Sequence, residues 1–403
     1  MRFVRRIVLF TFALHLAPGW MLFQLAGAKT IVSLLGAFGY ALASAMLLRG
    51  RLELGFDDRP VAPLRAFFER LYYAVWGASL AASVLSVLAV PVLFLLDEGS
   101  RRGGFAGVLA AALATGTYAV FVRSRMLRVV RQTITVATLP PAFEGFRIAH
   151  LSDVHFGSLY REAAFERVIT LTNQEDVDLV ALTGDYVTTG NRFHAEAARA
   201  LGRLRGKHGT LAVLGNHDNF CDREPLLSEF EKRGIVLLRN ERFDEIVREG
   251  QTLRVVGIDD TFTRRANVAA ALDSEGSETT HVALVHDPRV FPELAARGVS
   301  LTLAGHTHWG QIGVPFLAKH LNFGRLIFKR FNTSAIEGSA RLVVHPGIGT
   351  TGPPIRLGIA PTISILSLVG SRGEVLAAGR YEPERTESTK WTESVEVHGA
   401  RSA

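Results

Sequence analysis

The first 122 residues of this 403-residue chain contain four long stretches without a formally charged side chain. Each stretch has 19 residues or more, which is enough for a helix to cross a hydrocarbon core of about 30 Å. His15 and Pro18 in the first stretch do not exclude a span, because neighbouring helices can satisfy freed backbone groups. The chain is therefore expected to begin with four transmembrane helices, at residues 7–26, 30–48, 71–96 and 103–122.

The first stretch has a second interpretation. The residues MRFVRR precede an apolar run that ends at Ala26, Gly27 and Ala28, a pattern also typical of a cleaved signal peptide. The second uncharged stretch follows almost at once, which favours a membrane helix.

Arginine is distributed unevenly around the four stretches. Twelve arginines, at positions 2–6, 49–70 and 123–131, would lie on one side of the membrane, against Lys29, Arg101 and Arg102 on the other. This bias favours a cytoplasmic location for the larger set. The chain after residue 123 is then expected on the cytoplasmic side of the inner (plasma) membrane.

Charge and cysteine content exclude some functions. The net charge of +7 follows from the same arginine bias, and no basic stripe after residue 123 indicates nucleic acid. Cys221 is the single cysteine, so neither an intramolecular disulfide nor a thiolate zinc site is expected.

After residue 130 the pattern changes to short apolar runs that alternate with amphipathic segments. Helices are predicted at Glu162–Asn173, 195–204, 225–233 and 292–297, between runs typical of buried strands. This alternation favours parallel βαβ units, and further strands near 253–258, 342–344 and 362–368 suggest a second sheet. The fold class is therefore α/β: four transmembrane helices (1–130), a two-sheet α/β sandwich (131–380) and a polar tail (381–403) expected to be disordered.

Five of the apolar runs stop at residues that can hold a metal ion. Loops that leave the carboxyl ends of strands in an open α/β sheet converge on one crevice. Side chains two residues apart in an extended chain point to the same face. The pair Asp153 and His155, and the pair His306 and His308, could therefore each serve one site. The eight donors are Asp153, His155, Asp185, Asn216, His217, His286, His306 and His308.

The donor types indicate the chemistry. Carboxylate, amide oxygen and imidazole suit Mn²⁺, Fe or Zn²⁺. Two divalent ions would outweigh the charge of Asp153 and Asp185, leaving a positive site for an anionic phosphoester. Such a pair of ions can bind the attacking and leaving oxygens and supply hydroxide near neutral pH. Gly184, Gly215 and Gly305 would let the backbone turn where strands become loops.

These motifs, in this order, resemble those of the calcineurin-like metallophosphoesterases over about residues 145–370. The resemblance implies a metal-dependent hydrolase of phosphoric esters or pyrophosphates with two divalent ions, most often Mn²⁺. It implies that Asp185 bridges the ions and that His217 contacts the phosphate and protonates the leaving group. The remaining ligands would be Asp153, His155 and His308 for one ion and Asn216, His286 and His306 for the other.

The membrane-anchored branch of this family is most similar, through Gly305 to Gln311 and through Gly349 to Arg356. It includes phosphodiesterases and a type of UDP-2,3-diacylglucosamine pyrophosphatase. The resemblance carries over the metal ligands but not the substrate; the membrane anchor, which would hold the site beside a bilayer, favours a lipid-linked substrate such as UDP-2,3-diacylglucosamine. Trp309 departs from the usual glycine and could reshape the cleft. Soluble substrates such as cyclic nucleotides, or a catalytically silent metal-binding membrane protein, are the alternatives.

Several residues keep two interpretations. The basic, aromatic segment 316–331, with Lys319, Arg325, Lys329 and Arg330, suits an acidic membrane interface or an ordinary buried strand and loop. Asp218 either orients His217 or is a surface residue, and His345 could reach the cleft. His150 and His281 are expected within strands, and His15 in the membrane.

Overall fold

The computed structural model describes residues 2–54, 61–272, 281–318, 320–328 and 330–371. The tail at 381–403, Lys319 and Lys329 lie outside the described residues. The predicted boundaries of the three segments stay predictions.

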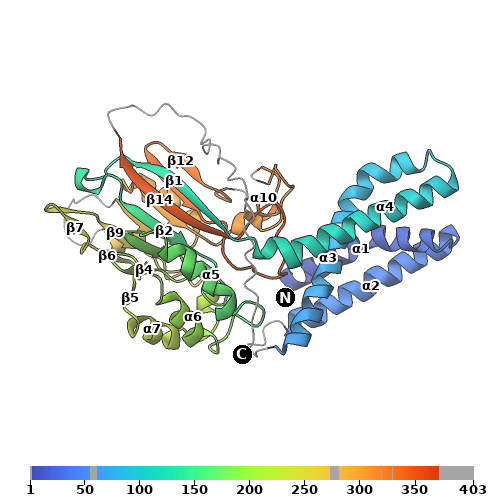
Figure 1. The fold of residues 1–403 in the computed structure, drawn as a ribbon, viewed down its shortest axis with the longest axis horizontal. Coiled ribbons are helices and arrows are strands. Elements are labelled where there is room, and N and C mark those ends of the chain that lie inside the picture. Colours follow the sequence, from blue (N-terminus) through green and yellow to red (C-terminus); the bar gives the residue numbers. More distant parts are fainter. Residues whose placement is uncertain (1, 55–60, 273–280, 319, 329, 372–403) are drawn as a thin grey trace, which may run out of the picture.

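Four long helices form the N-terminal part, as predicted. They are long and apolar enough to cross a membrane, and Figure 1 shows them projecting together from one end of the α/β part. Large apolar side chains such as Leu35 and Leu88 are exposed on their surface, as lipid-facing positions would be. The helices are α1 Arg2–Leu25, α2 Thr30–Leu54, α3 Pro63–Leu93 and α4 Glu98–Thr117, and α4 continues through a π turn (Tyr118–Val122) and a 3-10 turn (Arg123–Arg125).

The first sheet has six strands in the order β1-β14-β2-β3-β4-β5. The strands β2 to β5 are parallel, whereas β14 is antiparallel to β2 and parallel to β1. Their bounds are β1 Arg128–Val136, β2 Arg147–Leu151, β3 Leu179–Leu182, β4 Thr210–Ala212, β5 Ile235–Leu237 and β14 Thr362–Gly370.

The second sheet also has six strands, in the order β12-β13-β11-β10-β9-β6. Its four central strands are parallel, and an antiparallel strand lies at each edge. The bounds are β6 Glu241–Phe243, β9 Val255–Gly257, β10 Val282–Leu284, β11 Leu301–Ala304, β12 Ala335–Glu337 and β13 Ala340–Val344. A separate hairpin pairs β7 Val247–Arg248 with β8 Gln251–Thr252.

The two sheets face each other across a buried apolar core, with helices on their outer faces. Ile148 and Leu179 of the first sheet share this core with Leu284 and Leu303 of the second. The helices α5 Glu162–Asn173, α6 His194–Leu201 and α7 Glu224–Glu231 cover the first sheet, and α8 Val268–Leu272 and α9 Phe291–Ala296 cover the second. The predicted α/β sandwich is confirmed, but the strand expected near 362–368 in the second sheet lies in the first sheet as β14. The helix predicted at Glu162–Asn173 has these bounds, and the other three predicted helices are shifted by one to three residues.

The α/β part contacts the membrane helices directly. Ile355 lies in a buried cluster with Leu14, Trp76 and Ala119, and Ile312 packs against the same cluster. The segment 316–331 beside it is not a buried strand: it forms one helical turn, α10 Gly324–Ile327, within a loop. Figure 1 shows α10 near the junction of the sheets and the helices.

Candidate metal centre

The predicted donors meet at one end of the sandwich, although they come from two sheets and not from one open sheet. Asp153, Asp185 and Asn216 follow β2, β3 and β4 of the first sheet. His286 and His306 follow β10 and β11 of the second. Because the parallel strands of both sheets end at the same edge, their loops converge as an open sheet's loops would.

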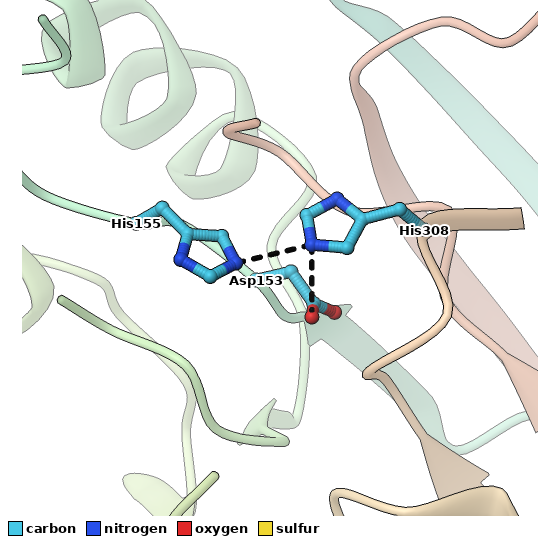
Figure 2. Close-up of side chains that lie close together, drawn as sticks. All are labelled: Asp153, His155 and His308. Carbon is cyan, nitrogen blue, oxygen red and sulfur yellow. Dashed lines mark hydrogen bonds and ion pairs between the residues drawn. The ribbon is translucent and has the colours of Figure 1, made fainter. Parts of the chain in front are cut away.

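The first group contains Asp153, His155 and His308, which are all buried and could hold a metal ion. The His308 Nε2 atom lies 3.0 Å from His155 Nε2 and 3.3 Å from Asp153 Oδ1 (Figure 2). Figure 2 shows one ring nitrogen of His155 facing one of His308, and the same His308 nitrogen facing the Asp153 carboxylate. Three donor atoms therefore face one small volume.

The second group contains Asp185, His286 and His306. The His286 Nε2 atom lies 3.2 Å from Asp185 Oδ2 and 3.2 Å from His306 Nδ1. The opposite nitrogen of His286, Nδ1, lies 2.7 Å from the Thr183 carbonyl oxygen and can donate to it. A carbonyl behind an imidazole fixes the tautomer that leaves Nε2 free for a metal.

Asp185 lies between the two groups. Its Oδ2 atom is 3.6 Å from His155 Nε2 on one side, as well as 3.2 Å from His286 on the other. Its Oδ1 atom accepts a hydrogen bond from the His217 backbone N–H at 2.9 Å. One carboxylate oxygen is thus within reach of both groups.

Asn216 and His217 lie beside these groups. The Asn216 Oδ1 atom is buried and has no hydrogen-bond partner among the described residues, which is uncommon for a buried amide oxygen and fits a metal ligand. The His217 ring lies 4.7 Å from the His155 ring, centroid to centroid, and its Nδ1 lies 2.6 Å from the Thr188 carbonyl oxygen. His217 also forms a possible metal-binding group with His155 and Asp185.

The pKa shifts of His155 and His306 favour neutral imidazoles, which can bind a metal ion, and His286 is the exception. Burial, helped by nearby His217, lowers the pKa of His155 to about 3, and burial with His286 lowers the pKa of His306 to about 4. Burial disfavours protonation of His286 as well, yet Asp185 raises its pKa to about 10. The environment of Asp185 therefore favours positive charge next to it, which a divalent cation supplies.

The backbone at the ligands is unusual. Asp153, His155, Asp185, His306 and His308 all have φ between +49° and +71°, a region that costs energy for residues other than glycine and is concentrated at functional sites. The chain was expected to be extended from Asp153 to His155 and from His306 to His308, and these φ values show that this expectation is wrong. Asp153 and His155 still share a group, but the turn at each residue sends His306 and His308 to different groups.

Two of the three flanking glycines are needed for space and not for a turn. Gly184 has φ of +90°, as expected. A Cβ on Gly215 would lie 2.2 Å from Asp185 Oδ1, and one on Gly305 would lie 2.5 Å from Asp153 Oδ2. Neither Gly215 nor Gly305 has a positive φ.

Both interpretations of Asp218 are wrong. Its side chain is buried and accepts hydrogen bonds from four backbone N–H groups, none of which belongs to His217. These are the N–H groups of Asp185, Tyr186, Val187 and Gly215, at 2.8, 2.8, 3.3 and 2.9 Å. Asp218 therefore fixes the loop that presents Asp185.

The sequence did not indicate the role of Arg356, which holds backbone carbonyls together beside His308. It is fully buried, donates to the carbonyls of Pro346, Gly349 and Ala360, and lies 3.5 Å from His308 Nδ1. Its position after Gly-Pro-Pro-Ile gave no signal of burial, since arginine is seldom fully buried.

Gln311 and His345 form hydrogen bonds in the same region. The Gln311 amide bonds to the backbone of Thr351 and Pro353, so the two motifs 305–311 and 349–356 contact each other. His345 does not join the donor groups of the described residues: its ring lies 5.0 Å from that of His150, and its Nδ1 accepts from the Gly347 N–H.

Comparison with known proteins agrees with this arrangement. The calcineurin-like phosphoesterase family profile matches residues 146–310. The chain is 31% identical to the uncharacterized metallophosphoesterase YkoQ of Bacillus subtilis (strain 168), over 56% of this chain and 84% of YkoQ. It is 27% identical to YkuE of the same organism, over 66% of this chain and 95% of YkuE.

A further relative contains membrane segments. The chain is 26% identical to a Danio rerio transmembrane protein with metallophosphoesterase domain, over 70% of this chain and 71% of that protein. Together with four helices able to span a bilayer, this indicates a membrane protein. The chain belongs to the calcineurin-like metallophosphoesterase family and is a metal-dependent hydrolase of phosphate-containing substrates.

Proposed function

We propose that this protein hydrolyses a phosphodiester or pyrophosphate bond in a lipid-linked substrate, with UDP-2,3-diacylglucosamine as a candidate. The observation that supports this most is the position of the donor cluster on loops next to those that pack on the membrane helices. Gly347 and Gly349 lie against His308 and Asp153, and Ile355, a few residues later, packs on α1, α3 and the π turn after α4. A substrate held in the bilayer would need only a short path to the site.

The ligand assignment is part of the proposal. Asp153, His155, Asp185 and His308 would hold one divalent ion, and Asp185, Asn216, His286 and His306 the other. The buried Asn216 oxygen without a partner and the two-sided position of Asp185 support this division. The chemistry supplied by two bound divalent ions, Mn²⁺ being the first choice, is Lewis-acid activation of water and phosphoryl oxygens.

His217 is proposed as the proton donor to the leaving group. Its Nδ1 can donate to the Thr188 carbonyl in either protonation state, so its Nε2 is the atom that gains or releases a proton. Its backbone N–H donates to Asp185, which fixes the ring beside the cluster. A general acid must lie within hydrogen-bond reach of the leaving oxygen, and the half-buried His217 lies at the edge where substrate would enter.

The arginine bias further supports an inner-membrane location with the α/β part on the cytoplasmic side. Arg123 and Arg125 lie where α4 ends and β1 begins, so the arginines and the site lie at the same end of the helices. Precursors of membrane lipids that contain nucleotide diphosphates would be accessible from that side.

The test is hydrolysis by the full chain in detergent micelles with Mn²⁺. Product release is measured from bis(p-nitrophenyl) phosphate, from UDP-2,3-diacylglucosamine and from a cyclic nucleotide, with Asp185→Asn as the control for contaminating activity. Faster turnover of the lipid-linked substrate than of either soluble one is expected. A preference for the cyclic nucleotide would replace the lipid-linked proposal, and no Mn²⁺-dependent release from any substrate would favour a silent metal-binding protein.

A further inference from the structure

A cavity of about 260 Å³ lies where the last membrane helix meets the α/β part. Arg123 and Arg128, at the end of α4 and the start of β1, line it together with Trp309, Phe316 and Thr362. None of the described residues that line it is acidic. The cavity therefore combines two cations with walls of apolar and uncharged polar side chains.

Arg123 is buried there without an anionic partner. Its exposed fraction is 7%, and its guanidinium has no hydrogen bond or ion pair to any of the described residues, nor does that of the exposed Arg128. Arg356, the other buried arginine in this region, has three carbonyl acceptors. A largely buried cation without an anionic partner is costly, and the Arg123 nitrogens are not among the fully enclosed unpartnered atoms of the described residues. The Arg123 guanidinium is therefore accessible to an anion that enters the cavity.

The wall formed by the loop 312–331 is exposed and apolar. Phe316, which lines the cavity, is fully exposed at 104%, and Val314, Leu317 and Leu321 are 46–54% exposed. The same loop contacts membrane helix α1, because the Phe323 ring lies 6.0 Å from that of Phe10. Exposed apolar side chains continuous with a membrane-spanning helix are typical of a surface that enters the bilayer.

We propose that this cavity binds the phosphate headgroup of an anionic membrane phospholipid. Arg123 and Arg128 would donate to the phosphate oxygens, and an acyl chain would run over Phe316 and Leu317 into the bilayer. The volume lies just below the roughly 300–1,000 Å³ of sites for drug-sized ligands, so the headgroup fits and the chains must remain outside. This lipid site does not depend on the hydrolytic reaction proposed above.

The test counts lipids bound to the full chain. The protein in detergent receives phosphatidylglycerol, phosphatidylcholine or inorganic phosphate, and native mass spectrometry weighs the complex, so that an intact lipid is distinguished from a hydrolysed one. The variants are Arg123→Gln and Arg128→Gln. Arg125→Gln is the matched control, because Arg125 is exposed at the same end of α4 and does not line the cavity.

Wild type and Arg125→Gln are expected to bind one phosphatidylglycerol more tightly than phosphatidylcholine. Arg123→Gln should weaken that binding about tenfold or more, the usual effect of losing a charge-assisted hydrogen bond. If Arg123→Gln fails to fold, the exposed Arg128→Gln gives the same test. Equal binding of both lipids, unchanged binding in both variants, equal weakening in Arg125→Gln, or Arg123-dependent binding of inorganic phosphate as tight as that of the lipid would each overturn the proposal.

Discussion

His217 belongs to a possible metal-binding group and is also proposed as the general acid, and one variant separates these roles. His217→Ala is expected to retain two bound metal ions and to lower kcat by a factor of about 10²–10⁴, the usual contribution of general acid–base catalysis. Metal content is measured by elemental analysis and turnover with bis(p-nitrophenyl) phosphate. His320→Ala, at an exposed position away from the cluster, should change neither value. Loss of one metal ion from His217→Ala would instead make His217 a ligand.

Gly305 shows how closely the second sheet approaches the first at the ligands. A Cβ at this position would lie 2.0 Å from Ser152 Oγ and 2.5 Å from Asp153 Oδ2. Gly305→Ala should therefore displace Asp153 and lower Mn²⁺ affinity by tenfold or more, as measured by metal titration of the purified protein. In Gly370→Ala the new Cβ meets its nearest atom at 3.5 Å, so this control should bind Mn²⁺ like wild type.

At the scale of strands, His281 links β10 to the chain that enters β9. Its Nδ1 accepts a hydrogen bond from the Arg254 backbone N–H at 3.0 Å, and burial lowers its pKa to about 4, with Arg254 acting in the same direction. In the unfolded chain this histidine takes up a proton near pH 6.5, whereas in the folded chain it stays neutral down to about pH 4. The stability that neutral His281 gives to the fold is therefore complete above pH 6.5 and is lost as the pH falls toward 4. After allowance for solvent screening, the loss is about 1–2 kcal/mol.

His281→Asn keeps an acceptor near the Nδ1 position but does not titrate. Its apparent melting temperature should therefore fall less than that of wild type when the pH is lowered from 7 to 5. The measurement is thermal unfolding in detergent at both pH values. Equal losses in the two proteins would assign the acid sensitivity to other groups.

The strands and their ligands were predictable, because short apolar runs indicate buried strands and the polar residues that follow parallel strands meet at one edge of the sheet. The turns at the ligands were not. Asp153 and His308 have a positive φ, which non-glycine residues seldom adopt, and no local sequence pattern indicates it. Asp218 was missed for a similar reason, because most of its partners are backbone N–H groups of the loop after β3. Arg356 bonds to carbonyls of its own segment, Pro346, Gly349 and Ala360, and its burial depends on how that segment packs against the rest of the molecule.

For the whole molecule, the helix bundle and the α/β part meet over an interface that includes buried groups from both. The backbone N–H of Arg356 donates to the Ala119 carbonyl at 3.2 Å, within the π turn that follows α4. The sequence predicted both parts from their composition. It could not predict their contact, because Ile312, Ile355 and Leu357 resemble ordinary loop residues until the helices that cover them are in place.

We predict the orientation of the whole molecule in the membrane from the charged residues at the two ends of its helices. Four helices return the chain to the side on which it began. Near that end of the helices lie Arg5, Arg51, Arg70 and Arg125. At the opposite end, Arg101 and Arg102 follow the turn between α3 and α4. A fluorescent protein that matures only in the cytoplasm should therefore be bright when fused after Ala403, and alkaline phosphatase fused there should be inactive. Fusions within the α3–α4 turn at Gly99 should show the opposite pair of signals, which controls for expression. Active phosphatase after Ala403 would place the metal centre outside the cytoplasm and would exclude a substrate supplied only from the cytoplasmic leaflet.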